Sequence, residues 1–147
     1  MPIRPEHRWF YPIDWPQLSA VIRFERAGGR CQRCGRPHGA TVQHLGDGRW
    51  WDAEASTWRN GRGRTLSRLA PLEALPAGVA RHATRVVLAT AHLDHDPGNN
   101  RRRNLRALCQ RCHMLHDQEE RQRRRGLRLR MRRALGDLFF GPYASHL

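Results

Sequence analysis

The sequence predicts an α+β domain that is stabilised by a metal site and followed by a long basic helix. Two Cys-x-x-Cys pairs, at 31–34 and 109–112, have the spacing of metal-binding knuckles. Two short apolar runs, Thr84–His92 and Leu105–Leu108, have the composition of β-strands. An arginine-rich run then continues to about Leu135 without a proline. The 147 residues fit one domain.

The N-terminal part predicts an irregular segment followed by a short helix. Residues 1–15 are expected to be extended, with aromatic and apolar side chains that can pack on the domain as a clip. These side chains are Trp9, Phe10, Tyr11, Ile13 and Trp15. A helix should follow, because Pro16 suits a first turn and Gly28-Gly29 suits a helix end.

Residues 36–82 show no clean period, and their structure cannot be predicted. Trp50, Trp51 and Trp58 are too many large aromatics for a flexible linker. We therefore treat 36–82 as an insertion.

From Thr84 the pattern becomes ordered again. A strand over Thr84–His92, a polar loop over 94–103 and a second strand over Leu105–Leu108 lead into the second cysteine pair. A helix should start near Cys112, with Gly126 as a possible bend and Gly136 as its cap. Residues 119–147 would form the basic helix and a tail that contains Phe139, Phe140 and Tyr143.

The four cysteines predict a structural zinc site. Two pairs of soft thiolates, Cys31 with Cys34 and Cys109 with Cys112, match a closed tetrahedral shell. A thioredoxin-like role fits poorly, since there are two pairs and no βαβ pattern. Four sulfurs fill the zinc shell, so His113, next to Cys112, is left for another role.

Imidazoles and carboxylates crowd the segment from His92 to Asp117. A hard divalent cation can be held by such groups when they converge from a strand, a loop and a helix. On a helix His113 and Asp117 would share a face, at i and i+4. Phosphodiester hydrolysis needs a base for water and a cation for the developing charge, and this segment offers candidates for both.

The segment resembles the HNH nuclease motif, which is built on a ββα-metal (His-Me finger) fold: strand, loop, strand, helix. The resemblance rests on His92, the Asn104-Leu105 pair and the Leu-Cys-x-x-Cys-His ending at His113. It covers roughly 84–118 plus the knuckle at 31–34. It implies that His113 is a ligand of a catalytic Mg²⁺ or Mn²⁺ and that Asn104 braces the loop and orients the base.

The resemblance leaves two registers open for the base. One selects His92 as base, with Asp94 and His113 on the metal, and we prefer it. In this register Ala91 replaces the usual preceding acidic or histidine ligand, so Asp94 or Asp117 would complete the metal shell. The other register selects Asp94 as ligand and His95 as base.

The charge predicts a phosphate-bearing partner. The formal net charge is +14, and all 27 basic residues are arginine, whose planar fork pairs with phosphate. A helical stripe predicted to contact the DNA backbone without reading sequence comprises Arg121, Arg124, Arg128 and Arg132.

Taken together, the sequence predicts a metal-dependent DNA endonuclease with a structural zinc and no organic cofactor. No apolar run approaches the roughly 20 residues that cross a bilayer, and no secretory signal is evident, so we expect no membrane partner. The expected setting is the cytoplasm of a bacterial or phage-infected cell. The alternatives are a non-catalytic zinc module that binds nucleic acid and a nuclease directed at RNA.

Overall fold

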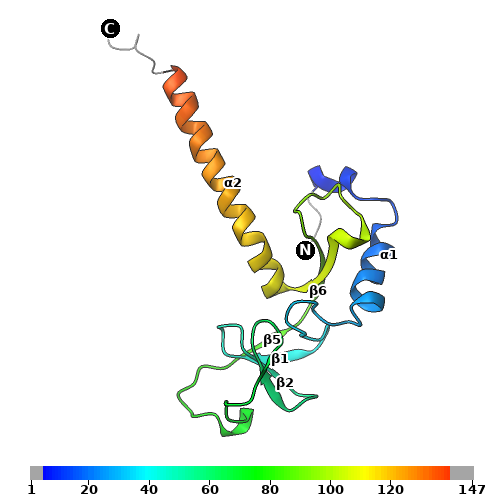
Figure 1. Cartoon of the computed structure of the whole chain (residues 1–147), viewed down its shortest axis with the longest axis vertical. Coiled ribbons are helices and arrows are strands. Elements are labelled where there is room, and N and C mark those ends of the chain that lie inside the picture. The colour runs from blue at the N-terminus through cyan, green and yellow to red at the C-terminus, as the bar shows by residue number, and fades with distance from the viewer. Residues whose placement is uncertain (1–4, 140–147) are drawn as a thin grey trace. The chain divides into compact units, whose positions relative to one another are not determined.

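The computed structural model describes residues 5–139 and shows a mixed α+β chain with antiparallel sheets (Figure 1). The chain divides into two compact units between His113 and Met114, and each is described by itself. The α+β class is confirmed. No helix of the described residues is long and apolar enough to cross a membrane. The predicted tail residues Phe140 and Tyr143 lie outside the described residues.

The N-terminal part begins with a 3₁₀ helix, η1 (Pro5–Phe10), where the sequence predicted irregular chain. Helix α1 (Trp15–Ala20) follows and continues as the π-helical η2 (Val21–Arg26). Pro16 lies in the first turn as expected. The helix ends where Gly28 and Gly29 adopt positive φ, and the Gly29 N–H donates to the Arg23 carbonyl at 3.0 Å.

The insertion forms a five-stranded antiparallel sheet of order β4-β3-β2-β1-β5. Its strands are β1 (Thr41–His44), β2 (Trp50–Asp52), β3 (Thr57–Arg59), β4 (Thr65–Leu66) and β5 (His82–Arg85), and η3 (Leu72–Ala74) lies between the last two. Trp50 and Trp58 are each only 1% exposed, and their indole N–H groups donate to the carbonyls of Cys34 and Ala70. These tryptophans are therefore core residues of the insertion.

The strand predicted over Thr84–His92 is wrong as one element. It divides into β5 and β6 (Leu88–His92), which belong to different sheets. Val86 between them is buried, and its backbone pairs with Gly39 and Ala40. Leu88 N–H instead donates to His38 Nδ1 at 3.0 Å, and Val87 N–H donates to Gln110 Oε1. The backbone therefore leaves the five-stranded sheet at Val87 and Leu88, where its N–H groups bond to the side chains of Gln110 and His38.

The second sheet is a hairpin of β6 with β7 (Leu105–Cys109), reached through the short 3₁₀ helix η4 (Arg102–Asn104). Its register pairs Leu88 with Cys109 at one end and His92 with Leu105 at the other. Helix η2 packs on this hairpin, and the core between them includes Ile22, Leu88, Ala91, Leu105 and Leu108.

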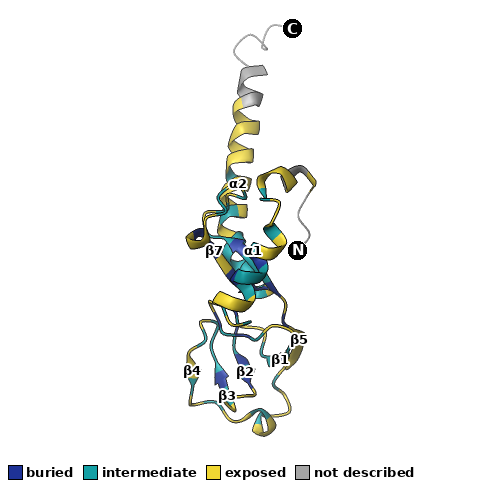
Figure 2. Ribbon diagram, turned by 90° about the vertical axis from the view of Figure 1, so that its right-hand side faces the viewer, coloured by how far each residue is buried: buried dark blue, intermediate teal, exposed yellow. Residues whose placement is uncertain are grey.

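Helix α2 (Gln110–Phe139) follows β7 directly. Gly126 does not break the helix, and the predicted cap at Gly136 is wrong, because both residues lie inside one continuous helix. Beyond its first turns the described side chains of α2 are mostly exposed (Figure 2). Apolar side chains such as Leu127, Leu129 and Met131 share this exposure, so within its own unit the helix presents no buried stripe.

Candidate functional site

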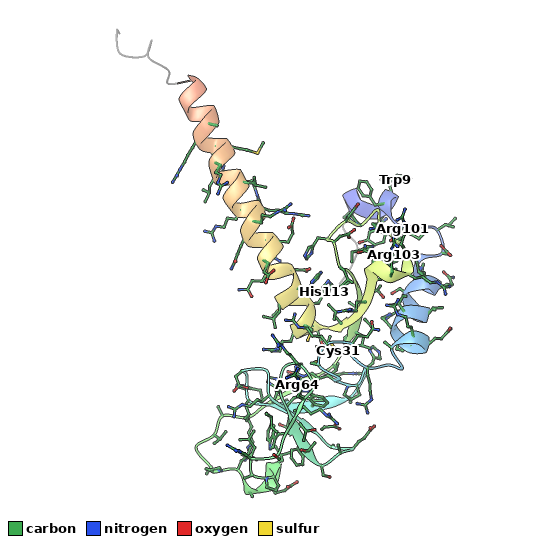
Figure 3. The ribbon with its side chains drawn as sticks, in the orientation of Figure 1. Trp9, Cys31, Arg64, Arg101, Arg103 and His113 are labelled. Carbon is green, nitrogen blue, oxygen red and sulfur yellow. The ribbon has the colours of Figure 1, made fainter. Side chains whose placement is uncertain are left out.

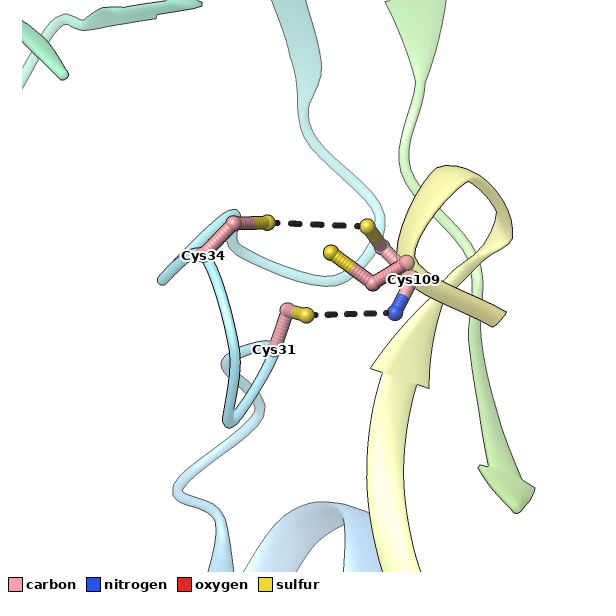
Figure 4. A group of neighbouring side chains, drawn as sticks. Cys31, Cys34 and Cys109 are labelled. Atoms are coloured by element: carbon pink, nitrogen blue, oxygen red, sulfur yellow. Dashed lines mark hydrogen bonds between the residues drawn. The ribbon is translucent and has the colours of Figure 1, made fainter. Parts of the chain in front are cut away.

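The four cysteines come together in a buried cluster at one end of the hairpin (Figure 4). Their sulfur atoms all lie within 4.8 Å of one another, and none of the four residues is more than 3% exposed. Cys31 and Cys34 come from the loop after η2, Cys109 ends β7, and Cys112 lies in the first turn of α2. The predicted convergence of the two pairs is confirmed.

Backbone hydrogen bonds hold the first knuckle against β7. Gln32 N–H donates to the Ala107 carbonyl at 2.9 Å, and the Gln32 side-chain oxygen accepts from Ala107 N–H at 2.9 Å. The Cys109 N–H points at Cys31 Sγ, 3.3 Å away. An N–H directed at a sulfur stabilises the thiolate form, which is the form that binds metal.

Because the four thiols lie so close together, the pKa values of two are lowered and those of the other two are raised. Hydrogen bonding with Cys112 lowers the pKa of the Cys109 thiol to about 7. Hydrogen bonds from the other thiols, led by Cys109, also lower the pKa of Cys31, whereas the pKa values of Cys34 and Cys112 are raised. A dication bound here would displace the thiol protons, because thiolates are the form that binds metal. The buried sulfur set is compatible with a structural metal and could bind zinc.

The opposite end of the hairpin carries a polar loop organised by Asn104. Its side-chain amide donates to Asp94 Oδ1 and to the Asn99 carbonyl, each at 2.8 Å. Its side-chain oxygen accepts from the Asp94 N–H at 3.2 Å, and its own carbonyl accepts from Leu93 N–H. Asn104 is buried, so one side chain joins both ends of the loop between β6 and β7.

Asp94 is the exposed carboxylate of this loop. Its oxygens accept from Asp96 N–H at 3.0 Å, from Asn104, and from Asn99 Nδ2 at 2.6 Å. These hydrogen bonds, led by the Asp96 amide, lower the pKa of Asp94 to about 2. The group is thus charged and accessible at neutral pH, as an oxygen ligand for a hard cation must be.

His92, the last residue of β6, is held by Asn100 and by aromatic rings. Its Nε2 lies 2.9 Å from Asn100 Oδ1, and the Asn100 amide nitrogen donates to the carbonyls of Phe10 and Pro97. Those bonds orient the amide with its oxygen toward the histidine, so Nε2 carries the proton of the neutral ring. Nδ1 is then the nitrogen able to accept one. Trp15 stacks on the ring at 5.4 Å, and Tyr11 meets its edge.

The remaining predicted residues are His95 in the loop between β6 and β7, and His113 and Asp117 on α2. His95 has a left-handed backbone, φ 61°, which is unusual for a residue with a side chain and is found preferentially at functional sites. His113 lies in the first turn of α2, half-buried beside Cys112 (Figure 3). Asp117 belongs to the second unit, where it pairs with Arg121 at 3.6 Å.

In the second unit the predicted arginine stripe is exposed on α2. Arg121 pairs with Asp117, and Arg124 pairs with Glu120 at 2.8 Å. Among the side chains that the structure describes, Arg128 and Arg132 form no ion pair. The stripe therefore has a partly neutralised first half and a more strongly charged second half.

Three residues around the loop were missed as site components. Asn99 and Asn100 have the composition of turn formers, yet one holds Asp94 and the other holds His92. Trp15 was expected only as part of an apolar clip, and it stacks on His92. No signal in the sequence pairs these residues, because hydrogen-bond and ring partners depend on the final loop path.

No family model, curated protein or solved structure matches this chain. What the site can do has to be inferred from its own residues.

Proposed function

We propose that this protein is a metal-dependent endonuclease of the HNH type that hydrolyses DNA phosphodiester bonds. The observation that carries the proposal is the bracing of Asp94 by Asn104. A buried amide fixes both the backbone and the carboxylate of an exposed, ionised aspartate at the mouth of the hairpin. The chain order of β6, loop, β7 and α2 agrees with the ββα arrangement that the motif implies.

Asp94 and His113 are the proposed ligands of the catalytic cation. A carboxylate oxygen and an imidazole nitrogen suit Mg²⁺ or Mn²⁺, and Asp94 needs no deprotonation at neutral pH to take part. When bound, the cation would stabilise the charge that develops on the phosphate and on the leaving oxygen.

His92 is the proposed general base. Its hydrogen bond to Asn100 and its stack on Trp15 fix the ring and its tautomer, which is how a third group orients a catalytic base. Nδ1 would take a proton from water while the water oxygen attacks phosphorus. The bond from phosphorus to the 3′ oxygen then breaks, and the departing oxygen takes a proton from solvent water, which leaves a 5′-phosphate and a 3′-hydroxyl, as the motif implies. His95 is the second candidate for the base.

A plasmid-nicking assay with magnesium or manganese tests the proposal. We expect the zinc-loaded protein to convert supercoiled DNA to nicked or linear forms, and His113→Ala to abolish this conversion. His92→Ala and His95→Ala, made singly and together, identify the base. His82→Ala is the matched control, because His82 is exposed in the separate five-stranded sheet. Undiminished cutting by the triple His92→Ala, His95→Ala, His113→Ala variant would refute the proposal.

A non-catalytic nucleic-acid-binding module is the second candidate. The observation in its favour is Ala91, which occupies a position where the motif usually has an acidic or histidine ligand. The net charge of +14 would serve such a module equally well. Tight, salt-dependent binding without metal-dependent cutting would favour this alternative. Duplex DNA, single strands and RNA tested side by side would show whether RNA is the preferred substrate.

A further inference from the structure

The segment before α1 has an exposed tryptophan beside the loop between β6 and β7. Trp9 is 92% exposed, whereas Trp50 and Trp58 of the insertion are each 1% exposed. Ile13 in the same segment is fully exposed as well. A large aromatic side chain left almost wholly in water is a feature of binding surfaces more than of stable packing.

This segment is fastened to the loop. Asn100 donates its side-chain amide to the Phe10 carbonyl at 2.9 Å. Gly98 of the loop also lies close to the Phe10 ring, since a side-chain methyl group at this position would be 3.9 Å from the ring. The next aromatics, Tyr11 and Trp15, pack on His92. Trp9 therefore precedes Phe10, whose carbonyl is held by Asn100, and Asn100 in turn bonds to the candidate base His92. The Trp9 ring itself faces solvent.

Two exposed arginines lie in the same region as Trp9, next to the loop between β6 and β7 (Figure 3). Arg101 and Arg103 lie one and three residues after Asn100, are exposed, and form no ion pair among the side chains that the structure describes. Figure 3 shows them in the same region as Trp9. Arg26 donates to the Arg102 carbonyl at 2.7 Å, so the backbone that carries them is held in place.

We propose that Trp9 stacks on an unpaired base of the bound strand while Arg101 and Arg103 contact the neighbouring phosphates. An indole face next to guanidinium groups is a combination that binds single strands, since every base has a π-face and every nucleotide a phosphate. A paired duplex keeps its base faces stacked inside. The preferred substrate would then be DNA with unpaired bases near the scissile bond, as in single strands, gaps or frayed ends. This inference rests on the proposed nuclease function and specifies its substrate class.

Equilibrium binding without cleavage tests the inference. Zinc-loaded protein is titrated, without magnesium or manganese, into a labelled single-stranded oligonucleotide and into the duplex of the same sequence, and anisotropy is recorded. We expect Trp9→Ala to weaken single-strand binding about tenfold and duplex binding less than twofold. Trp9→Phe should retain most of the single-strand affinity, because it keeps an aromatic face.

Ile13→Ala is the matched control, since Ile13 is equally exposed and has no π-face. It should leave both affinities unchanged. Unaltered single-strand binding by Trp9→Ala, or an equal loss on both substrates, would overturn the inference, as would a Trp9→Phe protein as weak as Trp9→Ala. Failure of the nuclease proposal would be seen separately, as absence of nicking by the unmodified protein.

Discussion

The two ends of the β6–β7 hairpin contrast in chemistry although they are built on the same ten residues. At the Leu88–Cys109 end, which we call the closed end, four sulfurs are buried away from water. At the His92–Leu105 end, the open end, a carboxylate and a stacked imidazole border an exposed loop. At about 3.4 Å per residue, the four steps between the ends separate them by roughly 14 Å. One short hairpin thus has a buried sulfur cluster at one end and an exposed polar loop at the other, with no residue in common.

The contrast indicates what each end is suited to do. A closed set of four soft ligands leaves no position for substrate, so a metal there contributes to folding. An accessible, hard oxygen ligand held by neighbouring amides can bind a cation and still admit a phosphate. The comparison therefore predicts that substitutions at the first end reduce metal content and stability, whereas substitutions at the second end reduce activity.

The largest effect is expected from Cys109→Ser. The change removes one thiolate from the closed end, and structural zinc contributes about 10–16 kcal/mol of apparent binding free energy to small domains. We expect loss of bound zinc and loss of the cooperative thermal unfolding transition, measured by elemental analysis and circular dichroism. Asp94→Asn is the control and should keep both. A Cys109→Ser protein that unfolds cooperatively and retains full zinc would show that the cluster is not a structural site.

Asn104→Ala should instead damage the open end while the closed end survives. Loss of the buried amide leaves Asp94 unbraced, which should lower the free energy of unfolding by about 1–3 kcal/mol and reduce nicking roughly 10- to 100-fold. Zinc content should not change.

Asn60→Ala is the matched control for this prediction. Asn60 accepts from the N–H groups of Arg62 and Arg64 in a turn of the separate five-stranded sheet. Its loss should leave nicking unchanged. Equal effects of the two asparagine variants on nicking would mean that Asn104 acts only through general stability.

A smaller effect is expected from the arginines of α2, which belong to neither end. Replacing Arg128 and Arg132 with alanine should flatten the slope of log affinity against log salt by about 2, because each phosphate contact contributes about 0.9. The same change at Arg121 and Arg124 should flatten it less, since Asp117 and Glu120 already pair with them. Filter binding between low and physiological salt measures both, and identical slopes would contradict the expected difference.

The smallest effect is a shift in the titration of Asp94, followed by carboxyl NMR without added magnesium. Its folded pKa of about 2 lies below the ordinary 3.8, so its hydrogen bonds stabilise the fold above about pH 4, and this contribution is lost as pH falls through 2. Asn99→Ala removes the 2.6 Å bond and should raise the folded pKa toward 3.8, so the contribution becomes smaller and its loss is complete at a higher pH. An unchanged titration would mean that Asn99 does not hold the carboxylate.

Local spacing made the closed end predictable. Two Cys-x-x-Cys pairs define a site whatever lies between them, so 74 intervening residues did not hide it. The strand at Leu105 and the helix after it also followed from local composition and periodicity. The position of Asn104 came from the motif, but its partners Asp94 and Asn99 became visible only in the folded loop.

The insertion could not be predicted, because its strands are two to four residues long and its order depends on buried tryptophans. Too few residues alternate in such strands to establish a period. The division of the strand after Arg85 was missed for a related reason. Apolar Val86 and Val87 continue the strand composition, and it is His38 and Gln110, distant in sequence, that redirect the backbone.

Manganese binding to the zinc-loaded protein tests the central claim most directly. Electron paramagnetic resonance counts bound Mn²⁺ without requiring a substrate. We predict one Mn²⁺ per chain, lost in Asp94→Asn and in His113→Ala and retained in His82→Ala, with zinc content equal in all four proteins. Absence of bound manganese, or binding that survives both Asp94→Asn and His113→Ala, would contradict the assignment of a second metal centre to the open end of the hairpin.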